Sequence, residues 1–240
     1  WEIADRSRLL MLDNASSRYY HEVRRTPRPE SLSAYTLKKL LHMLESFNDD
    51  LAVSGLLSDE KMDDVLKRHE DTLKFMFLQT WTNSAWTPEE EEDAQSMLTS
   101  ELLPVNDLCL FISAVTLSLM ECFDLRKVMW LLDAYRHPDV NASQRALVGV
   151  IFIFHIYRNR LSLYPDLIKR VEFMDEISSF QEDVARIYHQ MLLCQETEKI
   201  EKKMREEIIP EMLKNVSSMR NMRFGFEENE EENDDKNPDW

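Results

Sequence analysis

Apolar residues recur along most of the chain with the 3.6-residue period of an α-helix. One stripe, formed by Leu37, Leu40, Leu41 and Leu44, lies on a predicted helix of about 17 residues that begins near Ser33. A second stripe lies on a predicted helix of about 22 residues from Asp59 and comprises Val65, Leu66, Leu73, Phe77 and Trp81. The same period predicts helices over residues 3–22, 88–100, 106–122, 125–135, 143–161, 165–178 and 180–208, and Pro210 kinks the last one or starts another that ends near Met222.

Helix-capping residues support this assignment. Thr87 precedes Pro88 and Glu90, which gives an N-cap, a proline at the first helical position and the glutamate of a capping box. Asn141 with Gln144 predicts a second box, and Ser58 predicts a third N-cap.

The most apolar stretch is RALVGVIFIFHIYRNR, residues 145–160. Its apolar run is shorter than the 18 or so residues of a membrane span, and Arg145 and Arg160 bracket it. As a strand it would have no partner, because no second β-rich segment occurs. We therefore predict a central helix that is buried on all sides, with His155 as a hydrogen-bonded core residue.

Residues 131–150, LLDAYRHPDVNASQRALVGV, resemble the turn and second-helix start of a HEAT-type repeat. In that family an apolar helix runs into a Pro-Asp turn, and an arginine and small residues then open the next helix. The corresponding positions are Pro138, Asp139, Arg145, Ala146 and Gly149, although the turn is longer and the glycine comes earlier than in the family pattern. The resemblance covers about one repeat and implies an α-solenoid, HEAT-like or degenerate tetratricopeptide-like, a fold that usually serves as a binding scaffold.

Glycine is scarce, with only Gly55, Gly149 and Gly225 in 240 residues. An all-β or doubly wound protein of this size needs more glycines for its turns, and a Gly-rich phosphate loop cannot be built from these three. The predicted fold is therefore an all-α array of about nine to eleven helices packed as antiparallel pairs.

The formal charge of −16 is unevenly distributed. Residues 227–240 contain eight acids and one base, so they carry −7 and the remainder carries −9. An acidic body repels phosphate backbones, which argues against nucleic-acid binding. The predicted organisation is one helical domain over residues 1–226, followed by an acidic linker or tail over 227–240.

Cysteine and histidine spacing suggests no metal or cofactor. Cys109, Cys122 and Cys194 cannot all pair within one chain, so reduced thiols and a cytoplasmic location are expected. No histidine stands four residues from another or three residues after a glutamate, which removes the two common helical metal motifs.

Aromatic residues near the turn at 82–85 have two interpretations. Trp81, Trp86 and Met76 could pack the junction between two helices, which is the usual role of such residues. Alternatively, they could form an apolar anchor site for a partner peptide.

These features favour a non-catalytic protein–protein interaction scaffold or adaptor, expected to be the N-terminal part of a longer polypeptide, with an unidentified protein or peptide partner. Two alternatives remain open: a compact helical enzyme or small-ligand domain with a site near His155, and a structural spacer. The sequence does not determine the oligomeric state or the partner.

Overall fold

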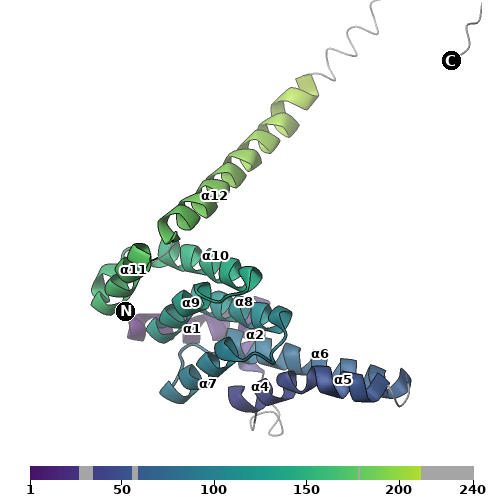
Figure 1. Ribbon diagram of the computed structural model, residues 1–240. Coiled ribbons are helices and arrows are strands. Elements are labelled where there is room, and N and C mark those ends of the chain that lie inside the picture. Colours follow the sequence, from purple (N-terminus) through teal and green to yellow (C-terminus); the bar gives the residue numbers. More distant parts are fainter. Residues whose placement is uncertain (27–34, 56–58, 178, 212–240) are drawn as a thin grey trace, which may run out of the picture. The chain divides into compact units, whose positions relative to one another are not determined.

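The computed structural model describes residues 1–26, 35–55, 59–177 and 179–211, in which every regular element is helical and no strand occurs. The prediction of an all-α fold is confirmed (Figure 1). The helices are α1 (Glu2–Ala15), α2 (Tyr19–Arg25), α4 (Leu37–Glu45), α5 (Phe47–Gly55), α6 (Asp59–Thr82), α7 (Pro88–Thr99), α8 (Val105–Glu121), α9 (Leu125–Tyr135), α10 (Val140–Tyr157), a short 3₁₀ turn (Leu161–Leu163), α11 (Pro165–Ile177), α12 (Phe180–Lys203) and a π-helical turn (Met204–Ile208).

The chain divides into two compact units, Trp1–Ile187 and Tyr188–Trp240. The described part of the second unit is helical and exposes large apolar side chains, among them Leu192, Leu193 and Ile200. The predicted boundary after residue 226, the acidic tail and the helix predicted to end near Met222 lie outside the described residues.

Serine residues interrupt two helices that the periodicity predicts as continuous. The predicted helix over 3–22 is two helices, because Ser16 adopts an extended conformation after α1. The helix predicted from Ser33 breaks at Ser46, where the hydroxyl donates to the carbonyl of Met43 at 3.2 Å. A serine hydroxyl that bonds to nearby backbone groups can interrupt a regular helix. The apolar periodicity does not reveal such interruptions, because it depends only on the positions of apolar residues.

The capping predictions are partly confirmed. Thr87 and Glu90 form the reciprocal capping box of α7. At α10 the predicted Asn141–Gln144 box is wrong, because Asp139 is the N-cap and accepts hydrogen bonds from the backbone N–H groups of Asn141 and Ala142. The predicted N-cap Ser58 lies outside the described residues.

Within the first unit, alternate helices pack against one another. Helices α4, α6, α8 and α10 contact in that order, and α7, α9 and α11 form a second series. The core between them includes an aromatic cluster of Trp86, Phe111 and Trp130, all buried. The ring of Trp86 stacks with Phe111 at 6.4 Å between centroids and meets Trp130 edge-on at 5.7 Å.

Helix α10 is covered on one side only, so the prediction of burial on every side is wrong. Helices α8 and α9 bury Ile151 and Ile153, whereas Phe154 is half-buried, His155 is exposed and Ile156 is 44% exposed. Among the described helices, α10 is long and apolar enough to cross a membrane by length and composition alone. Core helices pass the same test, so this is weak evidence for a span.

Gly149 allows α8 and α10 to approach closely. A Cβ atom built there would lie 2.4 Å from Oγ1 of Thr116 and 3.1 Å from Cδ2 of Leu131. Gly149→Ala is therefore expected to lower the free energy of unfolding by about 1–3 kcal/mol through overpacking, despite the better helix propensity of alanine. Denaturant unfolding of the single variants and of the double variant Gly149→Ala/Thr116→Ala checks this. The double variant should recover stability relative to Gly149→Ala, and purely additive effects would contradict the steric explanation.

A fully buried lysine links three segments of the first unit. Nζ of Lys127, on α9, donates to the backbone oxygen of Asn83 at 2.5 Å and to Oγ of Ser118 at 2.8 Å. The Ser118 hydroxyl also donates to the Asn83 oxygen, at 2.6 Å. Burial lowers the pKa of Lys127 to about 8, although Asp124 nearby opposes the shift.

Cys109 and Cys122 are free, as the sequence predicts, and both are buried. Burial raises the pKa of the Cys109 and Cys122 thiols, so both are held as unreactive thiols. Cys194 is free and exposed.

Candidate functional site

The residues that the sequence nominates for partner binding are not together at the surface. Trp86 is 2% exposed and Met76 is fully buried, so neither can contact a partner in this conformation. The backbone N–H of Trp86 donates to Oδ2 of Asp124 at 2.8 Å, which fixes the α6–α7 connection to the start of α9. The anchor-site hypothesis is therefore corrected for these two residues, which belong to the core.

Trp81 is half-buried and belongs to a different cluster. Its ring lies 5.1 Å from that of Tyr20, 5.8 Å from Phe77 and 6.2 Å from Tyr19. Together with Leu9 it completes the packing of α1 and α2 against α6. His155, near which the alternative small-ligand site was expected, is an exposed residue of α10, not a core one.

A groove that the sequence does not indicate lies between α4–α5 and α6. It consists of two cavities, of about 330 Å³ and about 190 Å³, that share Met43, Arg68 and Thr72 in their walls. We call this site the α4–α6 groove. Its remaining lining residues are Tyr35, Leu40, Ser46, Phe47, Asp50, Asp64, Val65, Lys67, His69, Asp71 and Phe75.

The packing of the two helices determines which side chains reach the groove. The Leu37, Leu40, Leu41 and Leu44 stripe of α4 is buried, as predicted, and Met43 lies at the edge of this stripe, half-exposed. On α6 the buried positions are Thr72, Met76, Thr80 and Thr82. This differs from the predicted stripe, of which Leu66 is 43% exposed.

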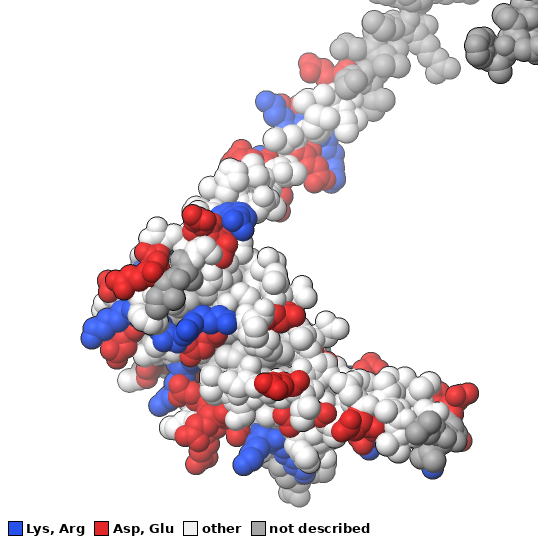
Figure 2. Space-filling model, viewed as in Figure 1, with Lys and Arg blue, Asp and Glu red and all other residues white. Residues whose placement is uncertain are grey.

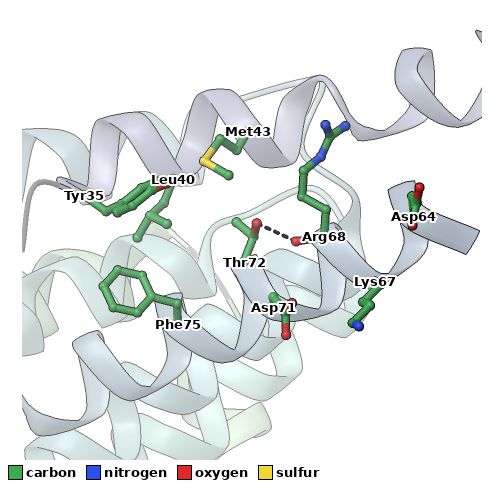
Figure 3. A pocket seen from close by; sticks show the side chains of 9 residues that line it. All are labelled: Tyr35, Leu40, Met43, Asp64, Lys67, Arg68, Asp71, Thr72 and Phe75. Atoms are coloured by element: carbon green, nitrogen blue, oxygen red, sulfur yellow. Dashed lines mark hydrogen bonds between the residues drawn. The ribbon is translucent and has the colours of Figure 1, made fainter. Parts of the chain in front are cut away.

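Aromatic rings form one end of the larger cavity. Tyr35 and Phe75 meet edge-on at 5.7 Å, and the ammonium group of Lys39 lies 4.2 Å from the Tyr35 ring centroid. Figure 3 shows Tyr35, Leu40 and Phe75 gathered at one end, with Met43 and Thr72 in the middle and Asp64 at the other end. The Thr72 hydroxyl donates to the carbonyl of Arg68 at 2.7 Å, so it is not free to bond a ligand. The middle of the groove therefore presents the methyl group of Thr72 and the thioether of Met43.

A stacked histidine forms the wall of the smaller cavity. The ring of His69 lies parallel to Phe47, with 3.6 Å between centroids, and its Nε2 is 3.3 Å from Oδ2 of Asp107. Burial raises the pKa of Asp107, and the neighbouring His69 opposes this shift. Nδ1 of His69 is buried and has no hydrogen-bond partner within the described part of the chain.

Charged side chains border the groove unevenly. Arg68 pairs with Asp50 at 2.7 Å, and both are substantially exposed. Asp64 and Asp71 line the larger cavity with Lys67. Figure 2 shows acidic side chains along the α5–α6 hairpin on the face in view. Residues 59–71 contain six acids and three bases, so this part of α6 is acidic.

The groove is better suited to binding than to covalent chemistry. Ser46 and His69 line the same cavity, but the Ser46 hydroxyl bonds the carbonyl of Met43 and Oδ2 of Asp50, so it does not form a nucleophile–base pair with His69. Nowhere in residues 1–26, 35–55, 59–177 or 179–211 do three His, Cys, Asp or Glu side chains cluster as metal ligands would.

No family model, no curated protein and no solved structure matches this chain. The residues and their geometry are therefore the only basis for a functional interpretation.

Proposed function

We propose that the chain is a helical interaction module in which the α4–α6 groove receives an apolar side chain of a partner segment. The observation that carries this proposal is a pair of adjacent cavities that share three lining residues and are lined by half-buried apolar residues, among them Tyr35, Met43, Phe47 and Phe75. Recognition grooves for peptides and helices combine such apolar floors with polar rims.

The chemistry of the lining supports a docking role. Methionine is unbranched and polarizable, so Met43 can adapt to different partner side chains. Aromatic residues such as Tyr35 and Phe75 supply a large contact area at a low conformational-entropy cost and are frequent in binding hot spots. The larger cavity, about 330 Å³, has room for a leucine or an aromatic side chain.

The arrangement of the helices supports a repeat-like scaffold. In an α-solenoid, equivalent helices of successive pairs stack in two layers. Contacts between α4, α6, α8 and α10, and between α7, α9 and α11, follow this pattern. An α-solenoid of antiparallel pairs that displays the groove is the architecture we propose.

Selection of displayed random peptides tests this function without assuming their charge. Peptides of about 12 residues selected on the full chain should bind Met43→Trp at least tenfold more weakly, because the indole fills the shared wall of both cavities. Leu66→Trp is the matched control, because Leu66 lies on the exposed side of α6 and lines neither cavity. Its affinity should equal that of the wild type.

Thermal unfolding of both variants establishes that they are folded. If Met43→Trp is not folded, Met43→Gln replaces it, since glutamine keeps the length of the side chain but removes its apolar character. Equal affinity of the wild type and the groove variant contradicts the proposal. Failure to select any peptide contradicts it as well and favours the interpretation as a structural spacer.

A further inference from the structure

The polar border of the α4–α6 groove indicates what kind of segment it accepts. Two carboxylates of α6 line the larger cavity, Asp64 at its far end and Asp71 beside Thr72 in its middle, and no ion pair is found for either in the described structure. Of the bases in this part of α6, Arg68 is already paired with Asp50 on α5. Lys67 is therefore the one base in the lining that does not take part in a salt bridge among the described residues.

The other end of the groove has a different character. There Lys39 lies over the ring of Tyr35, and the neighbouring backbone N–H of Lys38 donates to Asp93 of α7. The aromatic end thus has one lysine, Lys39, over the ring of Tyr35, whereas α6 contributes two carboxylates that are unpaired among the described residues, Asp64 and Asp71, together with Lys67 and the paired Arg68. A bound segment consequently meets aromatic and apolar groups at one end of the cavity, Asp71 in the middle and Asp64 at the far end.

We infer, on the basis of the proposed function, that the partner segment is a cationic amphipathic helix whose apolar side chain enters the cavity and whose Lys or Arg residues face Asp64 and Asp71. Along α6, Asp71 lies about one helical turn from Phe75 and Asp64 lies about three turns from it. Because a helix repeats its face every three to four residues, a partner helix with an apolar anchor at the aromatic end can place one base about one turn away and another about three turns away, facing Asp71 and Asp64. The acidic first half of α6 and the charge of −9 on residues 1–226 add a long-range attraction for such a segment.

Two synthetic peptides test the sign of the charge. One is an amphipathic Leu–Lys helix of about 14 residues, or four turns. The other has leucines at the same positions and glutamates in place of the lysines. Fluorescence anisotropy with the full chain at about 0.15 M salt, where charges more than about 8 Å apart are screened, measures both affinities. The Leu–Lys peptide should bind at least tenfold more tightly.

Charge-neutralising variants locate the attraction. The double variant Asp64→Asn/Asp71→Asn should bind the Leu–Lys peptide about 3- to 10-fold more weakly than the wild type, as expected for the loss of two exposed ion pairs. Glu89→Gln/Glu92→Gln on α7 changes the net charge equally at exposed positions outside the groove and should leave the affinity within about twofold.

The outcomes separate the partner class from the proposed function. Three results would overturn the inference that the partner segment is cationic. They are tighter or equal binding of the Leu–Glu peptide, no binding of the Leu–Lys peptide, and equal losses of affinity in the two charge-neutralised variants. Equal binding of the Leu–Lys peptide to Met43→Trp and Leu66→Trp would instead remove the groove as the docking site. Self-association of the peptide-free chain that Met43→Trp abolishes would indicate that a second copy of this chain occupies the groove, which also overturns the inference.

Discussion

Trp86→Ala is expected to lower the free energy of unfolding by about 3–5 kcal/mol, the usual cost of truncating a buried tryptophan. The side chain is 2% exposed and packs between Phe111 and Trp130. Its removal would leave a cavity at the point where the α6–α7 connection meets α8 and α9. Chemical denaturation of the full chain, followed by the loss of helical circular dichroism, measures the change.

Trp81→Ala provides the comparison within the same region. Trp81 is half-buried at the α1–α2–α6 junction, so its truncation should cost less than that of Trp86. A Trp86→Ala variant that unfolds at the wild-type denaturant concentration would contradict the packing described for this core. Such a result would return Trp86 to the surface role that the sequence leaves open.

Lys127 gives the second large expected effect. Lys127→Met should be neutral or stabilising, because methionine fills the same space without a buried charge and the Ser118 hydroxyl still donates to the Asn83 oxygen. Lys127→Ala should be destabilised by about 2–4 kcal/mol, because it leaves a cavity. Denaturant unfolding at pH 7 compares the three proteins. A Lys127→Met variant as unstable as Lys127→Ala would show that the ammonium group itself is required.

The pH dependence provides an independent check on Lys127. Its folded-state pKa of about 8 lies below the ordinary lysine pKa of 10.5, so the unfolded chain binds more protons between these two values. The stability of the wild type should therefore gain a few kcal/mol from this residue as the pH rises from about 8 to 10.5, and lose it as the pH falls back.

Other buried groups act in the opposite direction over this pH range. Burial raises the pKa of Tyr20 to about 12 and also raises the pKa of the Cys122 thiol, so their contributions to stability decrease as the pH rises. Since these groups are the same in Lys127→Met, the difference in stability between wild type and variant isolates the lysine. If the difference in unfolding free energy between wild type and Lys127→Met stayed constant from pH 7 to pH 10.5, burial would not lower the pKa of Lys127.

The sequence predicts the fold class well because two independent signals agree. The chain has too few glycines for the turns that a β protein of this size needs. Capping residues such as Thr87 also mark helix starts at the expected positions. Helix interruptions are less predictable, because a single serine hydroxyl at Ser46 redirects the chain without any change in the apolar pattern.

The buried face of α6 could not be predicted from hydrophobicity. Its buried positions include threonines, and Thr72 is accommodated because its hydroxyl bonds the carbonyl four residues earlier. A pattern that counts only apolar residues places the face on Leu66 instead, which is exposed. The tryptophan beyond this helix, Trp86, is buried through contacts with α8 and α9 that are remote in sequence.

The groove itself depends on tertiary packing. Tyr35, Met43 and Phe75 come from separate segments, and only the packing of α4 against α6 brings them together. One feature of the sequence does indicate the groove. Met43 is apolar although it lies just outside the leucine stripe of its helix, where a polar residue would be expected if only that stripe were covered. Met76, one of the residues that the sequence nominates for partner binding, is buried, whereas its neighbour Phe75 lines the groove.

Methyl NMR of the methionines tests the docking role of the groove most directly. The chain has 13 methionines, and selectively labelled methyl groups report contacts one residue at a time. On titration with a peptide selected on the full chain, the Met43 methyl resonance should shift in proportion to binding, whereas those of the buried Met76 and Met97 should stay in place. A bound peptide that leaves Met43 unchanged and shifts other methionines would contradict the α4–α6 groove as the partner site.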